Sequence, residues 1–269
     1  MTTISYDRYE FIKAERNDNV LTLALNRPAQ YNAIHHELHE ELADVLVDVA
    51  RDDATDVIVI TGVGKAFCAG GDLRAMKEHA DSYGAPGHYL SHVTAKRIIF
   101  GLLDLEKPVI AKVNGAAMGL GATIALFCDV VYMAEHAVIG DPHVKAGVVA
   151  GDGGAVIWPQ LIGYARAKEY LMTGDAIKAP EAFRMGLVNH VLPAAELDAA
   201  VQAFAERLAN GPRDAIRWSK TAANIGLKQL AHSIMDASMA YETVTLHSAT
   251  HKEAIDAFTE GRQPRFRGL

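Results

Sequence analysis

The sequence predicts an α/β fold with a helical C-terminal part. Short β-branched apolar runs alternate with segments of helical periodicity, and three glycine-rich loops each lie between a strand and a helix. From residue 165 onward the helical pattern dominates, apart from a short predicted strand near 188–191. A chain of 269 residues is long enough for one large domain. We expect a core over residues 1–195 and a helical region over 196–269.

The N-terminal segment predicts two strands, a helix and a buried strand. Residues 9–15 and 20–25 alternate apolar with polar side chains, as a half-buried hairpin does, and Pro28 prevents the second strand from continuing. Residues 36–50 have helical spacing, with one apolar face formed by Leu38, Leu42, Val45, Leu46 and Val49. The run VIVIT at 57–61 is typical of a strand buried on both faces.

The same succession then recurs along the chain. It predicts a helix over 89–105, a buried strand over 108–113, a helix ending near 127, and strands over 129–134 and 138–139. The glycine-rich loops lie at 62–73, 114–122 and 147–154, and a further helix begins near the last of them.

Composition excludes several classes of protein. Half of the residues are apolar and 22% are charged, so the chain has enough apolar surface for a core and does not resemble a disordered chain. The net charge of −7 argues against non-specific nucleic-acid binding. The start of the chain has charges throughout and no apolar h-region, and the longest apolar stretch, 109–128, contains Lys112 and Asn114. We therefore expect no membrane association.

The cysteine and histidine spacing predicts neither a disulfide framework nor a metal site. Cys68 and Cys128 are the two cysteines, and no CxxC motif is present. A reduced, cytoplasmic protein is the simplest interpretation. The HxxxH pair His88 and His92 lacks the glutamate of HExxH, so a helical surface pair explains it better.

Glycine-rich loops between strands and helices favour anion binding. The N-terminus of a helix offers unpaired N–H groups and the positive end of the helix dipole. The sequence contains neither GxxxxGK[ST] nor a GxGxxG after the first strand, so a nucleotide fold is poorly supported. Tight turns and close packing are the alternative explanation of any one of these loops.

Five segments resemble the crotonase (enoyl-CoA hydratase/isomerase) superfamily in collinear order. They are NRPAQYNA at 26–33, VIVITGVGKAFCAGGDL at 57–73, KPVIAKVNGAAMGLGATIALFCDVVYMAEHAVIG at 107–140, GYARAKEYLMTGDAIKAPEAFRMGLVNHVLP at 163–193 and HKEAIDAFTEGRQPRF at 251–266. The resemblance implies a crotonase/ClpP-like spiral of ββα units with a helical C-terminal trimerisation region. It also implies a homotrimer or a dimer of trimers, and no cofactor beyond the coenzyme A of the substrate.

The resemblance further implies an acyl- or enoyl-CoA thioester substrate. Two backbone amides would form an oxyanion hole for the thioester carbonyl, and the loop matches place them at Gly71 and Leu120. A substrate path is implied along Ala33, Ala69, Asp72 and Leu73, with Met118 as a pocket or core residue. Phe258 and Arg262, in the tail, are implied to reach the nucleotide bound to a neighbouring subunit.

The sequence departs from a typical hydratase at both glutamates that hold the reacting water. GLGAT places Thr123 where the first glutamate is expected, and GDPHV places His143 where the second is expected. A threonine hydroxyl does not titrate near neutrality, so it cannot serve as the base. His143 and Asp152 are the candidate replacements, with His143 as general base and Asp152 as the carboxylate that orients it.

The pattern PH…GDG…WP also resembles the 6-oxocamphor hydrolases, a branch that cleaves carbon–carbon bonds of cyclic β-diketones. His35 and Glu242 fall where that branch has site residues. Simpler interpretations stay open: Asp152 as a helix N-cap, His35 as a helix-start residue, and Glu242 on a solvated face or in an ion pair. Cys68 is interpreted as a small packing residue.

Three functions follow from these residues. The leading one is a hydratase/isomerase-like enzyme that uses Gly71, Leu120, His143 and Asp152. The first alternative is a carbon–carbon hydrolase (retro-Claisen) of a β-diketone or a β-ketoacyl-CoA ester. The second is a non-catalytic CoA-binding relative, since both glutamates are absent.

Overall fold

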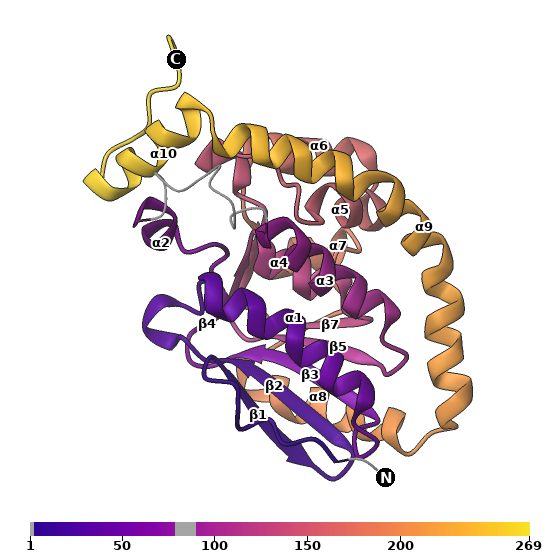
Figure 1. Ribbon diagram of the computed structural model, residues 1–269. Coiled ribbons are helices and arrows are strands. Elements are labelled where there is room, and N and C mark those ends of the chain that lie inside the picture. The colour runs from indigo at the N-terminus through magenta and orange to yellow at the C-terminus, as the bar shows by residue number, and fades with distance from the viewer. Residues whose placement is uncertain (1–2, 79–89) are drawn as a thin grey trace.

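The computed structural model describes residues 3–78 and 90–269, and its strands form two sheets (Figure 1). The first sheet has the order β1-β2-β3-β5-β7-β10 and the second β4-β6-β8-β9. The strands of the two sheets are β1 (Ile12–Asn17), β2 (Val20–Leu25), β3 (Val57–Gly62), β4 (Ala66–Cys68), β5 (Val109–Val113), β6 (Ala116–Met118), β7 (Val130–Ala134), β8 (Val138–Gly140), β9 (Ile177–Lys178) and β10 (His190–Leu192).

Helices cover these sheets and form the C-terminal part of the chain. They are α1 (His36–Arg51), α2 (Leu73–Glu78), α3 (Leu90–Asp104), α4 (Leu120–Phe127), α5 (Gly154–Ile162), α6 (Tyr164–Thr173), α7 (Ala179–Arg184), α8 (Ala194–Ala209), α9 (Arg213–Leu246) and α10 (Ala249–Glu260). The described part of the chain also contains the 3₁₀ turns η1 (Pro28–Gln30) and η3 (His143–Ala146). The predicted α/β class with a helical C-terminal region is confirmed.

The strands alternate between the sheets as the chain advances. β3, β5 and β7 pair in parallel in the first sheet, and each is followed directly by a strand of the second, β4, β6 or β8. These three also pair in parallel, with Cys68 opposite Ala117 and Ala117 opposite Ile139. Because neighbouring parallel strands end at the same edge, the loops after β4, β6 and β8 meet there. This succession of ββα units gives the spiral that the resemblance implied.

Most predicted elements are confirmed, but three short strands were missed. The predicted hairpin is present as β1 and β2, with Ile12 opposite Leu25. Its first strand, β1, begins three residues later than expected. β4 and β6 lie inside the segments 62–73 and 114–122 that we expected to be glycine loops, and β9 lies where only helices were expected. Strands this short carry no period-2 signal, and their sheet partners are distant in sequence.

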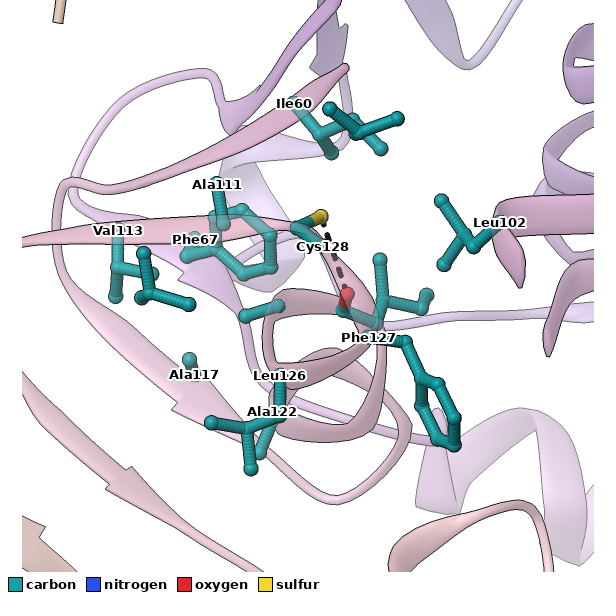
Figure 2. Close-up of a cluster of buried hydrophobic side chains, with 14 of the residues drawn as sticks. Ile60, Phe67, Leu102, Ala111, Val113, Ala117, Ala122, Leu126, Phe127 and Cys128 are labelled. Atoms are coloured by element: carbon teal, nitrogen blue, oxygen red, sulfur yellow. Dashed lines mark hydrogen bonds between the residues drawn. The ribbon is translucent and has the colours of Figure 1, made fainter. Parts of the chain in front are cut away.

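The core lies between the sheets and the helices packed on them (Figure 2). Phe67 of β4 packs beside Ala111 and Val113 of β5, and α4 brings Ala122 and Leu126 against them from the other side. All eight residues of α4 are buried, as expected for a helix that is apolar on every face. Cys128 donates its thiol hydrogen to the Ile124 carbonyl at 3.3 Å, and both cysteines are free and buried.

The buried side chain of Asn32, in the segment 26–33, joins this loop to the loop that follows β3. It is fully buried, has a φ of 57°, accepts from the Arg27 amide at 2.9 Å and donates to the carbonyls of Val63 and Ala66 at 3.0 and 2.9 Å. Asparagine tolerates this left-handed conformation better than most residues.

Replacing Asn32 with alanine should lower the free energy of unfolding by about 2–4 kcal/mol, since buried backbone groups lose their partners and alanine is disfavoured at this φ. Urea denaturation measures the change. The matched control is Asn210→Ala, because the exposed Asn210 amide bonds only within its own turn, to the Glu206 carbonyl. Equal stability of the two variants would contradict this role of Asn32.

Candidate active site

The candidate site lies where the loops after β4, β6 and β8 meet. These loops carry Gly71, Leu120 and His143 respectively. A Cβ added to Gly119 would lie 3.5 Å from His143 Cε1 and 3.7 Å from Gly70 Cα. The three predicted groups are therefore neighbours, although 72 residues of sequence separate the first from the last.

The amides of Gly71 and Leu120 are available to a ligand. Gly70 and Asp72 bond with Ile34 on either side of Gly71, which fixes this stretch of backbone. Leu120 is the first residue of α4, so its N–H has no partner within the helix. Neither amide donates a hydrogen bond to any residue that the structure describes. Two free N–H groups on adjacent turns are the arrangement that stabilises an oxyanion.

Gly119 sets the direction of the Leu120 amide. Its φ of 54° and ψ of −127° are the mirror image of an extended conformation, which a residue with a Cβ does not adopt without strain. The turn therefore requires glycine at this position.

His143 is held between two carboxylates. Its Nδ1 lies 2.5 Å from Oδ1 of Asp141, and its Nε2 lies 3.4 Å from Oδ2 of Asp152. Asp141 follows β8 directly and is fully buried. Burial alone would lower the pKa of His143, but the charges of Asp141 and Asp152 and their hydrogen bonds outweigh it and raise the pKa well above its usual value. The imidazole therefore holds its proton at neutral pH.

Asp152 and Glu242 lie close together but differ in protonation. Burial raises the pKa of Glu242 to about 8, with the charge of Asp152 acting in the same direction. Burial also acts to raise the pKa of Asp152, but the charge and hydrogen bond of His143 outweigh it and the pKa is lowered. Thr123 adds a hydroxyl donor 3.4 Å from Oδ1 of Asp152. One carboxyl group is thus protonated near neutrality while its neighbour is ionised.

The same side chains are of the types that bind metals. Potential ligand atoms of His143, Asp152 and Glu242 lie within 4.8 Å of one another, which makes them the one such group found among the described residues. The sequence predicted no metal site. Nε2 of His143 already faces Oδ2 of Asp152 at 3.4 Å as an ion pair.

Of the other predicted residues, His35 and Asp72 have local structural roles. His35 is the N-cap of α1, and its Nδ1 accepts from the Leu38 amide at 3.4 Å while its Nε2 lies 3.4 Å from Glu37. Asp72 pairs with Arg27 at 3.1 Å and accepts from the Arg74 amide at the start of α2. The contacts of His35 are thus those of a residue at the start of a helix. Gly153 is the N-cap residue of α5, but the Asp152 carboxylate accepts from the amide of Gly154, the first residue of that helix.

The remaining predicted residues lie around the loops or on the tail. Ala33 is buried, Ala69 is exposed, Leu73 opens α2 and Met118 ends β6, half-buried. Phe258 is exposed on α10, and Arg262 forms ion pairs with Glu253 and Glu260, each at 2.5 Å. Within the described residues, no hydrogen bond or ion pair joins Phe258 or Arg262 to the group around His143.

Two residues that act on His143 and Asp152 were not predicted from the sequence. Asp141 stands two positions before His143 in the DPH motif, and an acid so near a candidate histidine was an available signal. His39 is buried on α1, and its charge lowers the pKa of Asp152. Its position beside Leu38 and Leu42 on the apolar face of a predicted helix was the only signal for it.

The comparisons with known proteins agree with this fold. The family model for enoyl-CoA hydratase/isomerase matches residues 15–268. The chain is 36% identical to a crotonyl-CoA hydratase of Syntrophomonas wolfei, covering 96% of this chain and 98% of that protein. It is 34% identical to a 1,2-epoxyphenylacetyl-CoA isomerase of Escherichia coli, covering 96% and 99%.

A solved structure, an enoyl-CoA hydratase/isomerase from Mycobacterium paratuberculosis, matches with a TM-score of 0.88 at 32% identity, covering 93% of this chain and 99% of that one. The fold is therefore that of the crotonase superfamily of enzymes. The chain belongs to the enoyl-CoA hydratase/isomerase family. None of the described helices combines the length and apolar character needed to cross a membrane.

Proposed function

We propose that this protein acts on an acyl- or enoyl-CoA thioester and stabilises an enolate-like oxyanion with the amides of Gly71 and Leu120. The observation that carries the proposal is that these two free amides lie beside His143, which connects them to Asp152 and Glu242. A single donor to an oxyanion contributes about 3–4 kcal/mol to transition-state stabilisation. The family and the names of the relatives support a CoA ester as substrate.

The acid–base roles follow from the opposite pKa shifts of two neighbouring carboxyl groups. Asp152, ionised, accepts a proton from the attacking water, and Glu242, protonated, donates one to the α carbon of the substrate. For hydration, an O–H bond of water breaks, a C–O bond forms at the β carbon and a C–H bond forms at the α carbon. The carbon–carbon double bond becomes single, Asp152 has gained the proton lost by water, and Glu242 has lost the proton gained by the α carbon. Transfer of one proton from Asp152 to Glu242 then restores the starting state.

His143 then serves as the cation that keeps Asp152 ionised. Asp141 fixes the ring through Nδ1, so Nε2 points to Asp152. This assignment keeps the predicted His143–Asp152 pair in place of the two glutamates. It makes Asp152 the proton acceptor and Asp141 the orienting carboxylate, because the imidazole already holds its proton.

Product analysis tests this function against its alternatives. Purified protein is offered enoyl-CoA esters of several chain lengths, β-ketoacyl-CoA esters and cyclic β-diketones, and the products are weighed by mass spectrometry. We expect an enoyl-CoA ester to gain the mass of one water, or to be isomerised without a change in mass. Ring-opened or fragmented products would establish the carbon–carbon hydrolase instead. Tight CoA binding without turnover of any ester would establish the non-catalytic relative.

The protonation of Glu242 predicts a distinctive dependence of stability on pH. Its pKa rises from about 4.5 in the unfolded chain to about 8 in the folded one. The folded protein therefore holds this proton more tightly, and the corresponding stability is full below pH 4.5 and is lost as pH rises to 8.

Glu242→Gln removes this titration. Between pH 4.5 and 8, the wild-type protein should lose on the order of 4 kcal/mol of unfolding free energy relative to the variant, as the shift in pKa implies. Chemical denaturation at several pH values gives the difference. Parallel pH profiles for the two proteins would mean that Glu242 is ionised in the folded state.

We further propose that the remaining predicted residues bind substrate in an oligomer. Ala33, Ala69, Asp72, Leu73 and Met118 would line the path of the CoA ester, with His35 at its edge. Phe258 and Arg262 would contact nucleotide held by a neighbouring subunit. Large apolar side chains exposed on α9 support assembly as a trimer or dimer of trimers; they are Trp218, Ile225, Tyr241 and Val244. Sedimentation velocity measures the mass of the assembly.

A further inference from the structure

We infer that Thr245 and Ser238 of α9 are positioning residues for the acid–base group around His143. The inference rests on the proposed function. It assigns to the C-terminal helical region a part in the site, in addition to any part in assembly. Figure 1 shows α9 running along the outer edge of the molecule toward α10, with α5 beneath its later turns.

One face of α9 contacts the segment that connects His143 with Asp152. Ser238, Glu242 and Thr245 are four and three residues apart, so they share this face. Ser238 donates to the Gly151 carbonyl at 2.9 Å, and Thr245 accepts from the Val149 amide at 3.1 Å. Glu242 lies between them, one helical turn from each.

Thr245 joins both halves of the acid–base group. Its Oγ1 accepts from Val149 in the segment that leads to Asp152. The single hydrogen of this hydroxyl is shared between the backbone carbonyls of Tyr241, at 2.8 Å, and Glu242, at 2.9 Å. A displacement of the 149–152 backbone relative to α9 would break the bond from the Val149 amide.

Close packing makes the position of this segment depend on α9. A Cβ on Gly151 would lie 2.5 Å from the Ser238 carbonyl oxygen and 2.6 Å from Oε2 of Glu242, so only glycine allows the approach. The other end of the segment is fixed by α10, where His251 donates from Nδ1 to the Ala146 carbonyl at 2.8 Å. The His143–Asp152 segment is thus held at three successive points by the two C-terminal helices.

Thr245→Val tests this inference, because valine keeps the shape of the side chain and removes the bonds to Val149 and Glu242. We expect kcat for the CoA ester to fall about 10-fold or more, with little change in KM, since small misplacement of reacting groups is costly. Thr245→Ser keeps the hydroxyl and should restore most of the activity. Thr221→Val is the matched control, because Thr221 makes the same bond within α9, to the Arg217 carbonyl, and lies away from the segment.

A second measurement does not depend on turnover. Histidine-labelled protein is titrated by NMR, and the His143 signal is assigned by its loss in His143→Ala. The titratable groups around His143 are Asp141, Asp152, Glu242 and, from α1, His39. Thr245→Val and Ser238→Ala should each move the midpoint of His143, whereas Thr221→Val should leave it unchanged.

The outcomes separate the two proposals. If no CoA ester is turned over but the His143 midpoint moves in Thr245→Val, the proposed function fails and the positioning role stands. If the wild type turns over a CoA ester, and Thr245→Val keeps both its kcat and its His143 midpoint, the positioning role is overturned. An equal loss of activity in Thr245→Val and Thr245→Ser would overturn it as well.

Discussion

His143→Ala is expected to lower turnover of a CoA ester by at least about 100-fold, the lower end of the range for lost acid–base groups. Without the imidazolium, Asp152 would lie in a buried site beside Glu242 and lose the charge and the hydrogen bond of His143, which lower its pKa more than the charge of His39 does. The pKa of the proton acceptor would then rise, which leaves less of it ionised at neutral pH. Initial rates at saturating substrate, with CoA binding measured by calorimetry, separate this loss from a loss of affinity.

The matched control for this variant is His136→Ala. His136 is exposed in the turn between β7 and β8 and lies in the same part of the fold. We expect it to keep wild-type rates, and we expect both variants to bind a non-reactive CoA thioester. Near-wild-type turnover in His143→Ala would contradict the proposed mechanism, since the charge and hydrogen bond of His143 are the largest influences that lower the pKa of Asp152.

Gly119→Ala should reduce kcat by about 10²–10³-fold, the loss found when one oxyanion donor is removed. Alanine is strained at a φ of 54° and a ψ of −127°, so the turn would rotate and the Leu120 amide would leave its direction. Space around the new methyl group is adequate, since its nearest neighbour is His143 Cε1 at 3.5 Å. The effect therefore tests backbone conformation more than steric exclusion.

Gly226→Ala provides the comparison for this second variant. Gly226 lies inside α9 with nothing within 4 Å of an added Cβ, so alanine should be neutral or slightly stabilising there. Steady-state kinetics and thermal unfolding are measured for both. If Gly119→Ala unfolds normally and retains full kcat, the Leu120 amide is not an oxyanion donor.

The elements best predicted from the sequence are those whose periodicity extends over a whole segment. The apolar face of α1 was predicted from Leu38, Leu42 and Val49, all of which are buried. The strand at Val57–Gly62 was predicted from a β-branched run buried throughout. The glycine loops that carry Gly71 and Leu120 were recognised from their motifs, and within them Gly70 and Gly119 have φ values of 90° and 54°, which favour glycine.

The remainder depends on pairings across the chain that local sequence does not contain. β4 and β6 are three residues each, and their strand character comes from pairing with one another in the second sheet. Glu242 is about one hundred residues from His143 and meets it only after α9 folds back. The protonation states follow from burial, which no spacing of residues reveals.

Isotope labelling of the product tests the central claim most directly. An enoyl-CoA ester is incubated with the protein in D2O enriched in 18O, and the product is analysed by mass spectrometry and NMR. The proposed function predicts one 18O at the β carbon and one deuterium at the α carbon, both lost in His143→Ala and retained in His136→Ala. Bound CoA ester that acquires neither label, across all chain lengths, would contradict it.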